Sequence, residues 1–502
     1  MLRNKTIILG ITGSIAAYKA AEIASQLTQA GAKVNVIMTE EAIQFISPVT
    51  FRAITGRPVV TEMFDLTSEF SIEHVSLAEA ADIVVIAPAT ANIIAKLAAG
   101  IADDMLCCTV LATKAPVLIA PAMETNMYNN PVTQDNLSKL KARDFVIIGP
   151  AIGWLASGKE GPGRLADIKD IIGSICQILG KSGDLAGRHI VVTAGGTQEP
   201  IDPVRYISNR SSGKMGYALA EAARDRGAKV TLVTAPTSLP EPVGVDVIQV
   251  GTAQEMRQAV ENVTPQADAL IMAAAVADYR PIKAAKDKIK KGKAGLTLEL
   301  ECTPDILGTV KGNFIKVGFA AESSNLVENA REKLKQKGLD FIVANDITAS
   351  DSGFDTDTNR VTIIDRKGKI DSLPLLAKRE VADRILDRVV ELLAAKGERD
   401  NSILITVYPT YLEGYIHIPQ KHRSKFPGFK VPFELETNIG IFQVCIEDAN
   451  LPADRPRGSM QSKNPEIRRL RKWFKAHPEL KPRDKLIIEC IEPMKRYRLK
   501  IA

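Results

Sequence analysis

The sequence predicts an α/β protein with two tandem doubly wound parallel-sheet domains followed by a small, mostly β carboxyl-terminal domain. Three observations support this prediction. Apolar, strand-like runs alternate with helical patterns as far as about residue 180, the alternation restarts near residue 188, and the composition changes after residue 400. At 502 residues the chain is long enough for about three or four domains of ordinary size.

The first alternation predicts a domain over residues 1–180. A helical pattern, SIAAYKAAEIASQLTQAG, follows the first apolar run, and the runs themselves are KTIILGI, AKVNVIMT, DIVVIAPA, APVLIAPA and DFVIIGP. Strands joined by crossover helices form a parallel sheet that is covered on both faces. We expect such a doubly wound sheet here.

The second alternation predicts a similar domain over residues 181–397. It begins after the charged stretch KSGDLAGR, with helices expected over Ser211–Arg226 and Leu376–Ala395 and strands in HIVVTAGGT, AKVTLVTA, residues 269–273, IKVGFAA and DFIVAND. Both domains are expected to be flavodoxin-like or Rossmann-like. The polar stretch AAKGERDNS that follows is expected to be a linker.

The tail, residues 401–502, differs from the rest of the chain. It holds 19 lysines and arginines against 11 acidic residues, whereas the first 400 residues have a net charge of −2, and it contains ten of the 25 aromatic residues. One basic helix is expected over residues 465–476, between short strands in SILITVY, GYIHIPQ, VPFELET, IGIFQVCI and KLIIECIE.

The composition excludes wholesale disorder and a fibrous fold, because 45% of the residues are hydrophobic and 25% are charged. The six cysteines occur without CxxC spacing, and no apolar run approaches the roughly 20 residues that span a bilayer. The amino terminus reaches a glycine turn before a signal-peptide core could form. We therefore expect a cytoplasmic protein without a membrane segment.

Two features of the first domain each allow a functional and a structural interpretation. The turn GITGSIAAYK, residues 10–19, opens the first helix, so its backbone N–H groups suit a phosphate, but its glycines would also serve an ordinary crowded turn. His74 lies in a polar segment before a strand. An imidazole suits a general base, and a histidine in such a place is also common as a cap or a surface residue.

Three further motifs lie where doubly wound sheets bind ligands, at strand ends and in loops. They are PATAN at 88–92, PAMETNMY at 121–128 and the glycine-rich stretch WLASGKEGPGR at 154–164. With the glycine turn and His74, they occur in an order that resembles the homo-oligomeric flavin-containing cysteine decarboxylases. The resemblance covers residues 1 to about 180.

That resemblance implies an FMN-dependent decarboxylase whose flavin withdraws electrons from a thiol so that the neighbouring carboxylate can leave as CO₂. His74 takes the position of the catalytic base. The flavin is placed near five residues at strand ends: Gly13, Ser14, Thr39, Thr90 and Asn92. The substrate is placed near Glu124, Asn126 and Met127. Because the family's sites lie between subunits, the resemblance also implies a homo-oligomer.

Two positions depart from the pattern of that family. Glu124 stands where many relatives have asparagine, and Ser157 stands at the catalytic flap position that often carries a reactive cysteine. A carboxylate cannot supply the donors of an amide, so either Asn126 takes over substrate contact or Glu124 binds a different donor. Serine is a far weaker acid than cysteine, so water or another group is an alternative to Ser157 as the proton donor to the product.

The second domain carries two long motifs, VVTAGGTQEPIDPVRYISNRSSGKMG at 191–216 and AAAVADYRP at 273–281, followed by DKIKK and VGFAAES. The first opens a helix at Ser211, Ser212 and Gly213, where a nucleotide phosphate can bind, although its spacing is neither a Walker loop nor a GxGxxG fingerprint. Taken alone, DKIKK is more typical of a solvated charge run. Together the motifs resemble phosphopantothenate–cysteine ligase over residues 188 to about 390.

A decarboxylase followed by this ligase resembles the bifunctional enzymes of bacterial coenzyme A biosynthesis. The resemblance implies ligation of 4′-phosphopantothenate to cysteine through an acyl-cytidylate made from CTP with Mg²⁺ or Mn²⁺, then decarboxylation to 4′-phosphopantetheine. Asn209 would hold the acyl-cytidylate, with Arg205 and Ala275 also at the substrate, and Lys288 would be catalytic. Asp278 would lie at the metal, and the nucleotide set is Asp278, Lys288, Thr303, Pro304, Asp305, Ile306, Phe319, Lys333 and Lys337.

The basic helix of the tail has two interpretations. Its basic residues alternate with Trp473 and Phe474, which could form a nucleic-acid face, and the segment is faintly similar to small β-barrel DNA-recognition domains. The alternative, which we favour, is a packed β domain whose helix buries its aromatic side chains; an acidic protein partner is also open. Two other functions of the whole chain stay open: a related flavoprotein acting on another thiol, and a nucleic-acid-binding regulator with ligand-sensing α/β domains.

Overall fold

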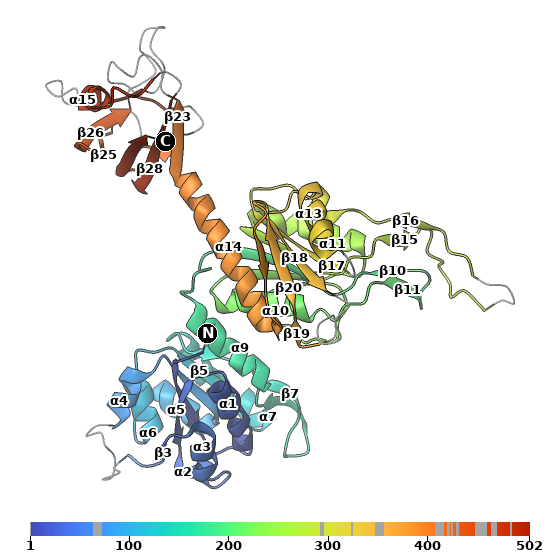
Figure 1. The fold of residues 1–502 in the computed structure, drawn as a ribbon. Coiled ribbons are helices and arrows are strands. Elements are labelled where there is room, and N and C mark those ends of the chain that lie inside the picture. Colours follow the sequence, from blue (N-terminus) through green and yellow to red (C-terminus); the bar gives the residue numbers. More distant parts are fainter. Residues whose placement is uncertain are drawn as a thin grey trace. The chain divides into compact units, whose positions relative to one another are not determined.

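The computed structural model describes most of the first 406 residues and parts of the tail (Figure 1). The chain divides into two compact units, Met1–Val389 and Val390–Ala502. The described residues are 2–63, 73–291, 296–322, 325–346, 356–406, 416–418, 422, 425–427, 431–446, 459–462, 469–481 and 484–501. Within these ranges no helix combines the length and apolarity needed to cross a membrane.

The first sheet has six parallel strands in the order β3-β2-β1-β4-β5-β6. Ile7 and Leu9 of β1 belong to one buried cluster and Ile8 to another, so both faces of the sheet are covered, as the valine- and isoleucine-rich runs predict. The strands are β1 (Thr6–Ile11), β2 (Lys33–Met38), β3 (Val59–Val60), β4 (Ile83–Ala89), β5 (Val117–Pro121) and β6 (Val146–Ile147).

Helices join these strands, and local sequence signals set their ends. For example, the hydroxyl of Ser47 accepts a hydrogen bond from the N–H of Val49, Pro48 occupies the first turn, and Gly56 closes the helix with a φ of 66°. The helices are α1 (Ala17–Gln29), α2 (Glu40–Ile43), α3 (Pro48–Thr55), α4 (Glu73–Ala80), α5 (Ala91–Ala99), α6 (Met105–Ala112), α7 (Thr125–Asn129), α8 (Pro131–Lys141) and α9 (Ile168–Gly180). The glycine-rich stretch forms the antiparallel hairpin β7 (Ala151–Trp154) and β8 (Glu160–Arg164).

The second sheet has eight strands in the order β13-β12-β9-β14-β17-β18-β20-β21. Six strands are parallel, as expected, and β20 pairs antiparallel with both β18 and β21 at one edge, which the sequence does not predict. A tight turn at Gly368 joins these two strands without a crossover helix, so they can only pair antiparallel. The strands are β9 (His189–Ala194), β12 (Lys229–Thr234), β13 (Asp246–Gln249), β14 (Ala269–Met272), β17 (Ile315–Glu322), β18 (Phe341–Asp346), β20 (Val361–Asp365) and β21 (Ile370–Ser372).

Two antiparallel ribbons leave the carboxyl side of this sheet and project together to one side (Figure 1). They are β10 (Gln198–Pro200) with β11 (Tyr206–Ser208), and β15 (Tyr279–Pro281) with β16 (Leu300–Cys302). A short pair, β19 (Thr358–Asn359) with β22 (Leu376–Ala377), precedes the last helix. The helices are α10 (Lys214–Asp225), α11 (Ala253–Val263), the 3₁₀ turn η1 (Thr264–Gln266), α12 (Ile306–Thr309), α13 (Leu326–Gln336) and α14 (Lys378–Asn401).

Helix α14 continues through residues 394–401, which the sequence predicts to be a linker. Gly397 stands inside the helix, where a glycine costs about 1 kcal/mol relative to alanine, and the good helix formers around it outweigh that cost. The expected end of this helix at Ala395 is therefore wrong.

In its described residues the tail forms a seven-stranded sheet in the order β23-β28-β29-β25-β26-β27-β24 and one helix, as expected. Trp473, Phe474 and Tyr497 are almost fully buried in its core. The elements are β23 (Ser402–Thr406), β24 (Ile416–His417), β25 (Phe433–Thr437), β26 (Gly440–Ile446), β27 (Ser459–Ser462), α15 (Arg469–Ala476), β28 (Lys485–Glu492) and β29 (Arg496–Ile501).

Candidate functional site

The first candidate site lies at the carboxyl ends of β1, β2 and β4. The strand order reverses at β1, which is where open α/β sheets bind ligands. The hydroxyl of Thr12 ties two of the loops together, because it donates to the carbonyl of Pro88 at 2.7 Å and accepts the N–H of Thr90 at 3.0 Å. This edge carries all five residues expected at the flavin: Gly13 and Ser14 after β1, Thr39 after β2, and Thr90 and Asn92 after β4.

One hydroxyl at this edge is suited to a bound ligand. Thr39 Oγ1 is buried and has no hydrogen-bond partner. Leaving such a group unpaired costs about 1–3 kcal/mol, which a ligand with a phosphate or hydroxyl group would recover. Thr90 Oγ1 is instead engaged, since it caps α5 by accepting the N–H of Ile93.

The glycines of the first turn are explained by crowding as well as by phosphate binding. A Cβ on Gly10 would lie 2.5 Å from Leu106 Cδ1, and one on Gly13 would lie 2.3 Å from Glu41 Cβ. Both interpretations of the turn therefore stand. His74 is the second residue of α4 and is half-buried, a position compatible with a base and with a structural residue.

Helix α7 and the β7–β8 hairpin form a polar patch beside this edge. Glu124 caps α7, because its Oε2 accepts the N–H of Asn126 at 2.6 Å, and its Oε1 lies 3.7 Å from Lys159 Nζ at the hairpin turn. Three buried atoms here lack a hydrogen-bond partner: Glu124 Oε1, Thr125 Oγ1 and Arg164 Nε. Asn126, Met127 and Ser157 are exposed.

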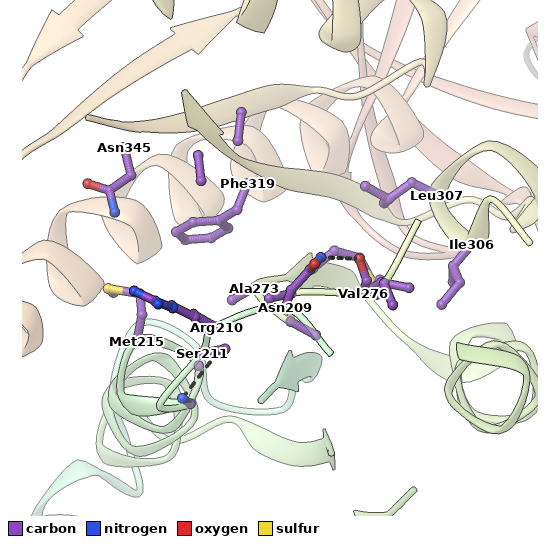
Figure 2. A pocket seen from close by; sticks show the side chains of 18 of the residues that line it. Asn209, Arg210, Ser211, Met215, Ala273, Val276, Ile306, Leu307, Phe319 and Asn345 are labelled. Carbon is purple, nitrogen blue, oxygen red and sulfur yellow. Dashed lines mark hydrogen bonds between the residues drawn. The ribbon is translucent and has the colours of Figure 1, made fainter. Parts of the chain in front are cut away.

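The second candidate site is a cavity of about 640 Å³ at the carboxyl ends of β9, β14 and β17 (Figure 2). It is the switch point of the second sheet, where the strand order again reverses. Ten of the residues expected at the ligase site line it: Asn209, Ala275, Asp278, Thr303, Pro304, Asp305, Ile306, Phe319, Lys333 and Lys337.

Side-chain hydrogen bonds hold the loop after β14 along this cavity. Asn209 Nδ2 donates to the carbonyl of Val276 at 2.9 Å, as Figure 2 shows. Thr303 Oγ1 donates to the carbonyl of Ala277 at 2.5 Å, and the N–H of Thr303 donates to the carbonyl of Asp278 at 3.0 Å. The exposed carboxylate of Asp278 is thereby fixed by its backbone at the cavity wall.

One end of the cavity is formed by Asp305, α12 and two lysines of α13. Lys337 Nζ lies 3.0 Å from Asp305 Oδ1, and Lys333 Nζ donates to the carbonyl of Phe319 at 3.1 Å. Burial alone would raise the pKa of Asp305, but the bonds from Lys337 and from the N–H of Gly308 hold it below its usual value. Asp305 is therefore ionised; Lys337 is fixed beside it, and Lys333 is fixed beside Phe319.

Arg205 and Lys288, also expected at the site, do not line the cavity. Arg205 binds the carboxylate of Asp202 and donates to the carbonyl of Ile289 at 2.7 Å, and the N–H of Ile289 donates to Asp202 at 3.1 Å. This clamp holds the backbone directly after Lys288, whose side chain is exposed. In this structure Arg205 therefore helps to fix the backbone next to Lys288.

Beyond the run Asn209–Gly213, four polar cavity residues were not anticipated from the sequence: Lys214, Asn345, Asn359 and Lys378. Two of them had a usable signal, since Lys214 directly follows the Ser-Ser-Gly turn and Asn345 lies near the carboxyl end of β18. Asn359 and Lys378 reach the cavity from the β19–β22 pair and the start of α14, and no local motif marks them.

The tail helix does not present its aromatic residues to solvent. Trp473 and Phe474 are 1% and 2% exposed, and Trp473 Nε1 donates to Asn438 Oδ1 at 2.8 Å. These rings cannot stack on bases, which supports the packed-domain interpretation. The first part of the expected basic helix, residues 465–468 with the basic Arg468, lies outside the described residues.

Comparisons with known proteins agree with this division of the chain. Residues 1–180 match the Flavoprotein family, and residues 185–393 match the DNA/pantothenate metabolism flavoprotein C-terminal domain family. Neither match extends into the tail. Among solved structures, the chain is similar to the C-terminal domain of a coenzyme A biosynthesis bifunctional protein CoaBC, with 43% identity over 43% of this chain and 100% of that chain and a TM-score of 0.37. It is also similar to the FMN-dependent cysteine decarboxylase SpaF, with 35% identity over 34% of this chain and 95% of that chain and a TM-score of 0.31.

Full-length relatives match both domains together. The coenzyme A biosynthesis bifunctional protein CoaBC of Bacillus subtilis is 46% identical over 405 residues, which is 80% of this chain and 100% of the relative. Those of Vibrio cholerae and Mycobacterium tuberculosis are 45% and 44% identical and are covered over 99% and 97% of their length, in each case by 78% of this chain. The chain therefore belongs to the CoaBC family of bifunctional coenzyme A biosynthesis proteins.

Proposed function

We propose that this chain performs two successive steps of coenzyme A biosynthesis, a CTP-dependent ligation of 4′-phosphopantothenate to cysteine and an FMN-dependent decarboxylation of the product to 4′-phosphopantetheine. The observation that carries the proposal is the cavity at the second switch point, which gathers ten of the expected ligase residues. Family membership over both domains supports the pairing of the two activities.

In the ligation, the carboxylate of 4′-phosphopantothenate attacks the α-phosphorus of CTP and pyrophosphate leaves. The cysteine amine then attacks the acyl carbonyl, and CMP leaves as the amide forms. Asn209 would hold the acyl-cytidylate, and Phe319, Lys333 and Lys337, which line the same cavity, would contact the nucleotide. The first turn of α10, after Ser211 and Ser212, offers backbone N–H groups to phosphate oxygens.

A divalent cation fits this site through Asp278. Mg²⁺ is commonly bound by one or two carboxylates together with phosphate oxygens and water, so one carboxylate at the cavity wall is sufficient when the nucleotide supplies the other ligands. Mn²⁺ has the same preference for oxygen. Lys288, held by the clamp at Ile289, would offset charge as pyrophosphate departs.

The decarboxylation is assigned to the first switch point. Bound FMN would supply the electron sink for the thiol, and Gly13, Ser14, Thr39, Thr90 and Asn92 would hold it, with the buried, unpartnered hydroxyl of Thr39 as the observation that supports the fit. His74 would remove the thiol proton. Met127 and Ser157 are exposed on the single chain, which supports a homo-oligomer in which a second copy completes this site.

Separate tests address the two halves. Purified protein should be yellow and release FMN on denaturation, and it should liberate CO₂ from synthetic 4′-phosphopantothenoylcysteine without CTP. It should release about one equivalent of pyrophosphate from CTP, Mg²⁺ and 4′-phosphopantothenate before cysteine is added. A colourless protein refutes the first half, and no pyrophosphate refutes the second.

A further inference from the structure

The end of the nucleotide cavity opposite α12 contains cationic and amide groups to which the ligase motifs assign no role. Figure 2 shows Asn345 and Met215 at one end of the view and Ile306 and Leu307 at the other. Lys214, the first residue of α10 and the neighbour of Met215, lines the cavity together with Lys378, the first residue of α14. This end is called the α10–α14 end below; it is made of Lys214, Asn345 and Lys378.

Lys378 is an unusual residue for a helix start. It is only 6% exposed, although its side chain is cationic, and a cation in the first turn of a helix opposes the helix dipole. Its Nζ donates to the carbonyl of Thr356 at 2.5 Å, and its N–H donates to the carbonyl of Asp357 at 2.9 Å. A placement that is unfavourable for folding in two ways points to a role in binding an anion.

Two further groups at this end point to a ligand. Asn345 is 8% exposed, lines the cavity, and has an Oδ1 without a hydrogen-bond partner. The N-terminus of α10, a helix of 12 residues, begins after Gly213 without a side-chain cap, and the helix dipole favours an anion there. These observations are independent of the burial of Lys378.

Asp357 has the geometry of an exchangeable counter-ion. Its Oδ1 lies 2.7 Å from Lys214 Nζ, and its side chain is 90% exposed. An exposed ion pair of this kind contributes little free energy, so a polyvalent anion can replace the carboxylate at low cost. Lys214 would then turn from Asp357 to the ligand without losing a charged partner.

We propose that Lys378 and Lys214 bind the terminal phosphates of the nucleotide triphosphate and that Asp357 occupies Lys214 until the triphosphate replaces it. This inference rests on the proposed ligase function; it gives a role to Lys214, which the first ligase motif contains, and adds Lys378, which lies outside the motifs. The orientation follows from the two ends: Lys337, which is paired with Asp305 beside α12, lies toward the base, and the α10–α14 end lies beyond the α-phosphate.

The test compares CTP with CMP by calorimetric titration of the full chain in Mg²⁺. Lys378→Met should weaken CTP binding about ten- to a hundredfold, since it removes a buried contact to a charged group, while CMP binding changes less than about twofold. Lys378→Arg should retain most of the CTP affinity. Lys335→Met is the matched control, because Lys335 lies on α13 between two cavity lysines but is exposed and does not line the cavity.

Asp357→Asn provides the opposite change. Without the competing carboxylate, CTP affinity should rise by up to about fivefold at low salt, and CMP affinity should stay constant. If Lys378→Met does not fold, Lys214→Met should show the same selective loss of CTP binding.

The two proposals fail in different ways. If the unmodified chain binds neither CTP nor CMP, the ligase proposal itself is refuted. If it binds both, and Lys378→Met and Lys214→Met leave the ratio of CTP to CMP affinity unchanged, the ligase proposal survives and the assignment of the α10–α14 end is wrong. An equal loss of CTP and CMP affinity also contradicts it, because that result places the lysines at the nucleoside.

Discussion

At the scale of single residues, the contacts of Glu124 show how a carboxylate fits at this position. The decarboxylases that the first domain resembles often have asparagine there. Its Oε2 caps α7 and its Oε1 faces Lys159 on the hairpin, so the side chain joins the two elements that border the site. Asparagine is also a good N-cap. Either residue can therefore form the N-cap of α7, but only glutamate can pair with Lys159 through a carboxylate.

Glu124→Ala and Glu124→Asn separate these two roles. The alanine variant should lose about 1 kcal/mol of local stability at α7, seen as faster amide exchange in residues 125–129, because the cap is lost. The asparagine variant should keep slow exchange and decarboxylate at least as fast as the unmodified chain. If the asparagine variant keeps slow exchange but decarboxylates as slowly as the alanine variant, and both are slower than the unmodified chain, the carboxylate itself takes part in the reaction and the capping role is not the important one.

His74→Asn tests the base assignment. The amide resembles the imidazole in size but cannot accept a proton near neutral pH, so CO₂ release should fall at least about a hundredfold while the flavin absorbance is retained. Flavin content measured on the same preparation is the control for folding of the site. Decarboxylation at an undiminished rate would show that His74 is a structural residue.

At the scale of elements, the turn between β10 and β11 positions the segment around Lys288 through the carboxylate of Asp202. The bonds from Arg205, and those from the N–H groups of Val204 and Ile289, hold the pKa of Asp202 well below its usual range, although burial opposes this. Because the folded-state pKa is lowered, the ionised clamp is fully present above the usual value of about 4 and is lost only as the pH falls through the lower folded value.

Asp202→Asn should therefore impair the ligase half alone. Loss of the clamp frees the backbone after Lys288, so pyrophosphate release should slow about tenfold or more while decarboxylation is unchanged. In the unmodified chain Asp202 should stay ionised between pH 5 and 9, so its titration should cause no change of the ligase rate in this range. Asp246→Asn, at an exposed position of β13, is the control. Equal ligase rates in the two variants would exclude a positioning role for Asp202.

The sequence predicts the elements best where burial dictates the pattern. The strand runs are buried on both faces, so their valine and isoleucine content identifies them, and the residues after those strands identify the two site edges. The edge pair β20–β21 is missed because a single turn, at Gly368, determines how the two strands pair. The continuation of α14 past Gly397 is missed because the helix formers around this glycine extend the helix. Lys378 and Asn359 are missed for a different reason: only the tertiary fold carries them to the cavity.

At the scale of the whole molecule, the two large sheets share the strand order 3-2-1-4-5-6 over six parallel strands, and in each sheet most of the residues expected to bind a ligand lie at the same switch point. The tail has its own core around Trp473 and Tyr497. Its outer sheet face carries cross-strand ion pairs, including Arg496 with Glu434 and Arg498 with Glu436. The described part of the tail therefore accounts for several of its basic residues as paired surface charges.

Removal of the tail should leave both activities intact. A chain that ends after Lys396 keeps Val381, Ile385 and Val389, the buried residues of α14 that lie in the first compact unit, so the core of the second domain stays covered. CO₂ and pyrophosphate release should each remain within about twofold of the full chain, compared at equal flavin content. Loss of the ligase activity would overturn the view of the tail as an appended module.

The central claim is that one chain converts 4′-phosphopantothenate to 4′-phosphopantetheine. The most direct measurement incubates the purified full chain with 4′-phosphopantothenate, cysteine, CTP and Mg²⁺ and follows the products by mass spectrometry. The account predicts 4′-phosphopantetheine, with one pyrophosphate and one CO₂ released for each molecule formed. Accumulation of 4′-phosphopantothenoylcysteine without CO₂ would contradict the decarboxylase half, and absence of both the intermediate and pyrophosphate would contradict the claim as a whole.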